Sequence, residues 1–213
     1  VVEGRALNTP AFDEGRFVVQ DEASQLIGEL ALVEAGDRVL DLCASPGGKT
    51  LALAAAVGAT GTVVAMDVRA HRVRLLMRTI ERCRLRNVTV VHGPADEPLP
   101  FRSETFAFVL VDAPCSGLGT VRRDPDIRWR RSPDDLARFS AAQRELLARA
   151  ADLVTPGGRM LYSTCSSEPE ENEDVVAAFL QDRPGFVQER VHQTLPFRDK
   201  LEAFYGAVLG RTM

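Results

Sequence analysis

The sequence is short of lysine, histidine and tryptophan, and it contains no long apolar run. No stretch reaches the roughly 20 apolar residues that a membrane helix needs, and the N-terminus lacks the basic and then apolar pattern of a signal peptide. Its 4 cysteines and 3 histidines show no CxxC pair and no other metal-ligand spacing. These absences argue against membrane spans, metal sites and a disulfide framework. We therefore expect a soluble, cytoplasmic protein with free thiols and no bound metal.

The chain is long and apolar enough to form one hydrophobic core. The chain has 213 residues, of which 45% are hydrophobic, and this length fits a single large domain. Residues 1–19 contain no complete structural unit of their own, so we interpret them as the remnant of a truncated N-terminal region. We expect residues 20–213 to form one monomeric domain.

Apolar runs and helical periods alternate along the chain. The pattern predicts strands at 38–41, 62–67, 88–92, 106–112 and 158–164, and helices at 20–34, 50–57, 70–85, 133–153 and 170–181. Two further short strands, 186–190 and 203–209, fit an antiparallel hairpin at the end. The alternation is typical of an α/β protein with a mainly parallel, seven-stranded sheet covered by helices on both faces.

Two cysteines follow predicted central strands. Cys115 stands in the segment Asp-Ala-Pro-Cys-Ser-Gly after one strand, and Cys165 stands in Ser-Thr-Cys-Ser after another. Because parallel strands end at one edge of the sheet, both thiols should emerge there, where open α/β sheets place their active sites. A buried cysteine is often only a small apolar residue. The shared position of the two after strand ends favours covalent catalysis instead.

A glycine-rich turn follows the first strand and opens a helix, which is where doubly wound sheets bind nucleotides. Its sequence from Asp41 to Thr50, DLCASPGGKT, has neither GxGxxG nor P-loop spacing. Asp67 ends the second strand and Asp96 follows the third. Carboxylates at successive strand ends fit an adenosyl ligand better than a pyrophosphate, which points to S-adenosylmethionine. The alternative for these acids is helix capping.

Positive charge is concentrated despite a net charge of -4. One arginine-rich block covers residues 69–86 and a second covers 122–131, within a segment, 113–132, that has no clear period. A segment of that length without secondary structure is usually functional. The first block fits a solvated helix face as well as a surface for RNA.

Four motifs together resemble the catalytic domain of RNA (cytosine-5) methyltransferases of the Sun/Fmu, or NOL1/NOP2/Sun, family. They are DLCASPGGKT at 41–50, DAPCSG at 112–117, RRDPDIRW at 122–129 and STCSSEPEEN at 163–172. The resemblance covers nearly the whole chain and implies a Rossmann-like, S-adenosylmethionine-dependent methyltransferase fold acting on RNA. The third motif favours the bacterial small-subunit rRNA branch. Two departures are Ser45, where many members have Ala, and the lack of the usual N-terminal RNA-binding region.

The resemblance also implies roles for the two thiols. C5 of cytosine is a weak nucleophile, so a thiolate must first add at C6. The family pattern assigns this addition to Cys165 and assistance in product release to Cys115. Charge that develops on the ring needs stabilisation, and we expect Lys49 to provide it, together with Asp112 if that residue holds or shares a proton. The alternative for Lys49 is a helix cap or a solvent-exposed side chain.

The remaining predicted site residues bind cofactor or RNA. For the cofactor we predict Asp41, Cys43, Ala44, Ser45, Pro46, Gly47, Gly48, Lys49, Asp67, Arg72, Asp96 and Asp112. For RNA, whose target base must be flipped or single-stranded, we predict Arg122, Arg123, Arg128 and Trp129. Trp129 fits a core anchor for its loop equally well. We expect the acids after Pro169 mainly to stabilise the first turn of the last helix.

Two other functions remain open at this level. One is a methyltransferase of a different substrate on the same fold, with structural cysteines. The other is a non-catalytic RNA-binding module for ribosome assembly, against which the intact acids and thiols count.

Overall fold

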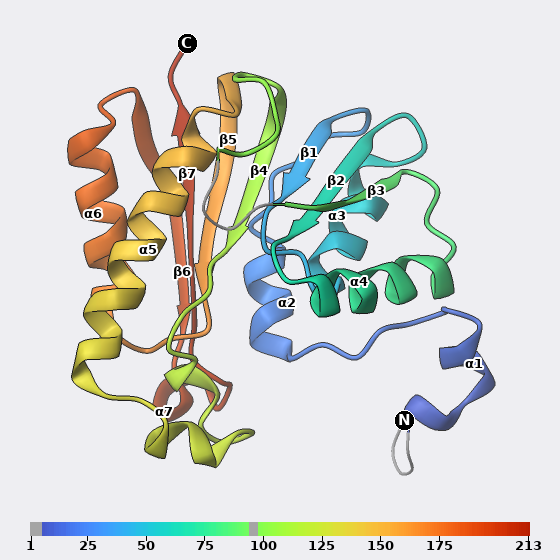
Figure 1. Ribbon diagram of the computed structural model, residues 1–213, viewed down its shortest axis with the longest axis horizontal. Coiled ribbons are helices and arrows are strands. Elements are labelled where there is room, and N and C mark those ends of the chain that lie inside the picture. Colours follow the sequence, from blue (N-terminus) through green and yellow to red (C-terminus); the bar gives the residue numbers. More distant parts are fainter. Residues whose placement is uncertain (1–5, 94–97) are drawn as a thin grey trace.

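The computed structural model describes residues 6–93 and 98–213, and these form one mixed sheet with the strand order β3-β2-β1-β4-β5-β7-β6. Strands β1 to β5 run parallel, while β7 is antiparallel to both β5 and β6. The predicted α/β class and C-terminal antiparallel hairpin are confirmed (Figure 1). The strands are β1 Arg38–Asp41, β2 Thr62–Asp67, β3 Val88–His92, β4 Phe106–Asp112, β5 Val154–Thr164, β6 Phe186–Thr194 and β7 Phe204–Arg211.

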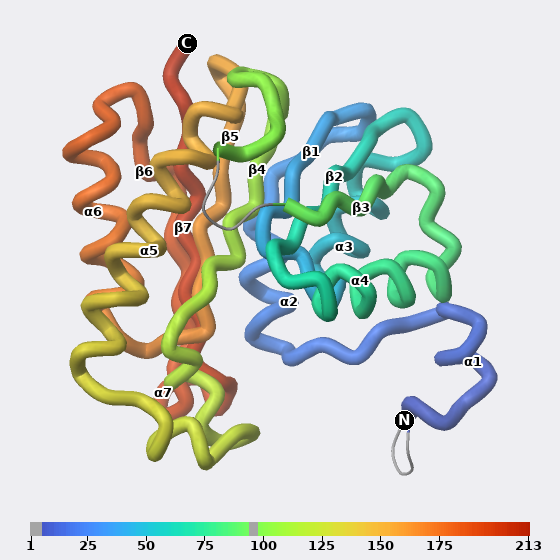
Figure 2. The backbone as a smooth tube through the Cα atoms, in the orientation of Figure 1, coloured from blue at the N-terminus to red at the C-terminus, as the bar shows by residue number. Residues whose placement is uncertain are grey.

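Helices cover both faces of this sheet, with α5 and α6 on one side and α2, α3 and α4 on the other (Figures 1 and 2). On the first side, Leu147 of α5 and Phe179 of α6 pack into a large apolar cluster with β4 and β5. On the second side, Leu53 and Val57 of α3 pack against Val63 and Phe108. The helices are α1 Pro10–Asp13, α2 Glu22–Gly28, α3 Gly48–Val57, α4 Ala70–Arg82, α5 Pro133–Ala151, α6 Glu173–Asp182 and α7 Pro196–Asp199.

Helix α2 is shorter than the predicted helix over 20–34. The Asp21 carboxylate accepts hydrogen bonds from the backbone of Ala23 and Ser24, so the helix begins at Glu22. Gly28, a poor helix former, stands at its end. A side chain at Gly206 of β7 would lie 2.8 Å from an Ile27 methyl carbon, so glycine there lets α2 approach the sheet closely.

Strands β1, β4 and β5 are neighbours and end at the same edge. Asp41 is the last residue of β1, Asp112 of β4 and Thr164 of β5. The strand order reverses between β1 and β4, which is the topological switch point where open sheets bind ligands. The loop after β4 extends beyond the sheet beside α7 (Figure 1). It holds the short 3₁₀ turns Leu118–Thr120 and Pro125–Trp129.

Candidate active site

The two predicted thiols meet beyond the ends of β4 and β5. The Sγ atoms of Cys115 and Cys165 lie 3.4 Å apart, within hydrogen-bond distance for sulfur, although the residues are 50 positions apart in the sequence. Both cysteines are free and partly accessible. The sheet therefore brings the two thiols close enough to act on the same part of a substrate molecule.

The hydrogen bond between the thiols makes them chemically different. The hydrogen bond with Cys115 has the largest effect on the pKa of Cys165 and lowers it. Lys49 also lowers this pKa, while burial and Asp112 raise it. The same hydrogen bond, together with burial, raises the pKa of Cys115 well above its ordinary value. Cys165 therefore ionises more readily than Cys115 to the thiolate, which is the nucleophilic form.

This difference predicts unequal alkylation by iodoacetamide. Cys165 should react faster than Cys115 near neutral pH, since the thiolate is the reactive form. In Cys115→Ala the donor is lost, so the alkylation midpoint of Cys165 should move to higher pH. Mass spectrometry of peptides alkylated between about pH 6 and pH 10 measures both rates. An unchanged midpoint in this variant would contradict the hydrogen-bonded pair.

Lys49, which is buried, and Asp112, which is partly exposed, form an ion pair beside the thiols. The Lys49 Nζ atom lies 2.8 Å from one Asp112 carboxylate oxygen and donates to the Ser24 hydroxyl at 3.0 Å. The other Asp112 oxygen accepts a hydrogen bond from Ser163 at 2.8 Å. Lys49 also lies 5.8 Å from the centre of the Phe204 ring. Lys49 and Asp112 both line the same cavity.

This cavity has a volume of about 610 Å³. From the predicted cofactor set, Asp41, Cys43, Ala44, Ser45, Pro46, Gly48, Lys49 and Asp112 line it. One Asp41 oxygen accepts from Thr50 at 2.7 Å, while Oδ1 is buried and has no hydrogen-bond partner among the described residues. Burial raises the pKa of Asp41 to about 7. An unpaired buried carboxylate oxygen calls for a donor from a ligand.

Asp67 and Arg72 lie next to this cavity rather than in its lining. Arg72 pairs with Asp67 at 3.1 Å and also donates to the backbone carbonyl of Ser45. The second Asp67 oxygen accepts from the Arg69 backbone at 3.1 Å, in the turn that precedes α4. Asp67 does not cap this helix, because Arg69 is the N-cap residue and has no side-chain cap. Gly47 has a positive φ of 110° at the start of α3. Asp96 lies outside the described residues.

A second cavity of about 500 Å³ adjoins the first, and Cys43 lines both. Its other walls include the apolar residues Val68, Leu99, Pro114 and Leu146. The sequence gives no signal for these residues, because isolated apolar residues in a loop or helix are indistinguishable from core residues. These residues come together in one cavity only through the tertiary fold.

Glu171 joins the two cysteine loops. The prediction that the acids after Pro169 stabilise the first turn of the last helix holds for Glu173 and is wrong for Glu171. Helix α6 begins at Glu173 instead of 170, and Glu171 lies before it, fully buried. Its carboxylate accepts from the Ser116 backbone at 2.8 Å, from the Ser116 and Ser166 hydroxyls, and from Gln143 at 3.0 Å. Since Ser116 follows Cys115 and Ser166 follows Cys165, one carboxylate holds both loops in place.

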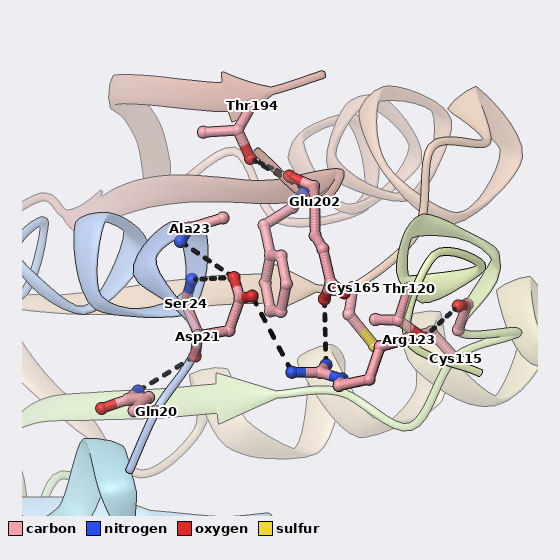
Figure 3. A network of polar contacts seen from close by, with 12 residues as sticks. Gln20, Asp21, Ala23, Ser24, Cys115, Thr120, Arg123, Cys165, Thr194 and Glu202 are labelled. Atoms are coloured by element: carbon pink, nitrogen blue, oxygen red, sulfur yellow. Dashed lines mark hydrogen bonds and ion pairs between the residues drawn. The ribbon is translucent and has the colours of Figure 1, made fainter. Parts of the chain in front are cut away.

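The predicted RNA contacts separate into two groups. Trp129 is 82% exposed, which rules out the core-anchor alternative, and Arg122 and Arg128 are exposed as well. Arg123 instead pairs within the protein, at 3.0 Å from Glu202 and 3.8 Å from Asp21 (Figure 3). Arg123 therefore lines the first cavity, and its guanidinium is held there by two ion pairs within the protein.

Solved structures define the class of this fold. The chain is similar to the crystal structure of PH0851, with a TM-score of 0.92, 35% identity and coverage of 97% of this chain and 50% of that one. NSun6 from Pyrococcus horikoshii, solved with SFG, gives a TM-score of 0.87 at 26% identity over 99% of this chain and 57% of the other. A SAM dependent methyltransferase from Aquifex aeolicus shares the fold at a TM-score of 0.59 and 19% identity, over 97% and 95% of the two chains. The fold is that of the S-adenosylmethionine-dependent methyltransferases.

The sequence comparisons define the family. The family model described as 16S rRNA methyltransferase RsmB/F matches residues 29–209, and the chain belongs to this family. It is 36% identical over 190 residues to the probable ribosomal RNA small subunit methyltransferase B of Bacillus subtilis (strain 168), covering 87% of this chain and 42% of the relative. The methyltransferase B of Vibrio cholerae is 37% identical over 209 residues, or 95% of this chain and 48% of the relative. The chain thus spans less than half the length of these curated relatives.

Proposed function

We propose that this chain transfers a methyl group from S-adenosylmethionine to C5 of a cytosine in RNA, with small-subunit ribosomal RNA as the substrate class. The observation that carries the proposal is the pair of thiols 3.4 Å apart beside the Lys49–Asp112 ion pair. An RNA cytosine needs a thiolate for activation and a second group for release, and this pair supplies both. Family membership supports the RNA substrate.

The chemistry assigns each residue a step. The Cys165 thiolate adds to C6 of cytosine, which makes C5 an enamine-like carbon able to accept a methyl group. Charge that moves to the ring edge is stabilised by the Lys49 ammonium, and by the Asp112 carboxyl group when it holds or shares a proton. Both groups line the same cavity. After the C5 proton leaves to a base, the C6–S bond breaks and Cys165 is released as a thiolate. Cys115, which holds a proton beside Cys165, assists this release.

The residues at the strand ends fit the cofactor. S-adenosylmethionine, when bound, supplies an electrophilic methyl group on a sulfonium. The unpaired Oδ1 of Asp41 suits the ammonium of its methionine part. The apolar cavity of Val68, Leu99 and Pro114 suits its adenine, with Cys43 lining the passage between the two. The predicted Asp67 lies at the end of β2 between Met66 and Val68 of this second cavity.

Asp41 gives the cofactor site a predicted pH dependence. Burial raises its pKa to about 7, so below this pH the carboxyl group is protonated and loses its attraction for an ammonium. The affinity for S-adenosylmethionine should therefore weaken as the pH falls below about 7, and Asp41→Asn should weaken it about 10- to 100-fold and flatten the profile. Isothermal titration calorimetry measures this, with Asp174→Asn, an exposed carboxylate on α6, as the control. An unchanged profile in Asp41→Asn would remove Asp41 from the site.

The direct test of the function is methyl transfer. Labelled S-adenosylmethionine and unmodified small-subunit rRNA should give label in RNA, and nucleoside mass spectrometry should identify it as 5-methylcytosine. Label in another nucleoside, or in protein, would favour a methyltransferase of a different substrate on the same fold. RNA binding without any transfer would favour a non-catalytic assembly module.

The state of the protein in the cell stays a prediction. We propose a cytoplasmic monomer that needs no metal. Among residues 6–93 and 98–213, no helix is long and apolar enough to cross a membrane. Over the same residues, no cluster of three or more potential ligand side chains could hold a metal ion.

A further inference from the structure

A third hollow, of about 690 Å³, lies beside the cysteine loops and plays no part in the chemistry described above. Residues 118–122 of the loop after β4 and residues 195–203 around α7 form it, with Ser167 at its end. Figure 1 shows α7 next to that loop, at the end of the sheet. We call this hollow the flanking groove.

Its surface combines apolar contact area with positive charge. Phe197 lines the groove and is 85% exposed, so its ring is free to stack on another flat group. Arg122 and Lys200 also line it, while the single carboxylate, from Glu202, is already paired with Arg123. An exposed aromatic ring in the same groove as two cations matches a nucleotide, with its base on the ring and its phosphate on the cations.

The groove lies next to the active-site cavity. Arg123 lines the cavity that holds Lys49, and Glu202 lines the flanking groove, so one ion pair of 3.0 Å separates the two (Figure 3). The groove wall is also bonded to the nucleophile loop, because the Gly119 backbone donates to the Cys165 carbonyl at 3.0 Å and accepts from Ala203 at 3.0 Å. A Cβ at position 119 would lie 2.0 Å from the Ala203 oxygen, so only glycine allows this contact.

We propose that the flanking groove binds the nucleotide next to the target cytosine in single-stranded RNA, stacking its base on Phe197. This rests on the proposed function, since the cytosine occupies the neighbouring cavity. The groove thereby reads the identity or presence of an adjacent base. Stacking of one base on an aromatic side chain is large enough to affect substrate affinity clearly.

The first test uses short oligoribonucleotides that contain one cytosine with 4-thiouridine on its 5′ or its 3′ side. Irradiation should crosslink one of the two to peptide 195–203 or 118–122. Phe197→Ala should raise the KM for methyl transfer about 5- to 50-fold with little change in kcat. The same variant should lose nothing further on an RNA that is abasic at that neighbouring position, because the stacked base is already absent. Val187→Ala, an exposed apolar side chain on β6, is the matched control.

The outcomes separate this inference from the proposed function. Crosslinks only outside these peptides, on a chain that still methylates cytosine, would overturn the groove and leave the function intact. Crosslinks in the groove without methyl transfer would support the groove and overturn the function, and absence of both would overturn both. Light scattering on the same variants provides a further check. A dimer that Phe197→Ala converts to a monomer would assign the groove to a second copy of the chain and contradict the proposal.

Discussion

Cys165→Ala is expected to abolish methyl transfer, with a fall in kcat on the order of 10⁴-fold or more, because loss of a nucleophile removes the whole covalent route. Cys115→Ala should behave differently. It retains the nucleophile and loses the proton that assists release, so a covalent protein–RNA adduct should accumulate. Denaturing gels of each variant with labelled RNA and S-adenosylmethionine, run beside a methyl count, measure both effects.

The control for this pair is Cys83→Ala, a free cysteine at the end of α4 that lines none of the cavities described. It should neither form an adduct nor lose activity. An adduct that depends on Cys115 instead of Cys165 would reverse the two roles. Wild-type activity in both active-site variants would show that the cysteines are structural, as the alternative methyltransferase hypothesis requires.

Glu171→Ala is expected to lower the free energy of unfolding by about 3 kcal/mol. The change leaves the buried Ser116 backbone N–H without its acceptor and removes one of the two acceptors of the Gln143 amide, which keeps the Pro114 carbonyl. Each buried unsatisfied group costs about 1 to 3 kcal/mol. It also frees the Ser116 and Ser166 hydroxyls, so the two cysteine loops lose their common attachment. Urea unfolding followed by circular dichroism gives the difference in free energy.

Two further variants test the cause. Glu170→Ala removes the exposed neighbouring carboxylate and should change stability by less than about 0.5 kcal/mol. Glu171→Gln keeps the volume and one acceptor oxygen, so it should recover much of the stability lost in Glu171→Ala. If Glu171→Gln were as unstable as Glu171→Ala, the hydrogen-bond network would not be the reason for the burial of this residue.

The sequence predicted the main elements of the sheet because their patterns are local. Strands β1, β2, β3 and β4 begin and end where the apolar runs do. The prediction was less accurate where a local signal competes with a cap or a contact. Because Asp21 caps α2, this helix begins later than the periodicity indicates. Helix α6 begins only at Glu173, because the buried Glu171 before it bonds to the cysteine loops.

The sequence by itself determined which chemical groups reach the active edge. Asp41, Asp112, Cys115 and Cys165 stand at or just after the ends of strands, and in parallel strands these ends share one edge whatever the details of packing. Family motifs then gave each group an expected role.

Only the tertiary structure decided how these groups act on one another. Three features depend on contacts between segments far apart in the chain. They are the hydrogen bond between Cys115 and Cys165, the attachment of both loops to Glu171, and the groove that Phe197 and Arg122 line together. Cys115 and Cys165 are 50 residues apart, and Ser116 and Glu171 are 55 apart. No local pattern encodes such a distance or the direction of a hydrogen bond, because both arise when separate loops pack against the same core.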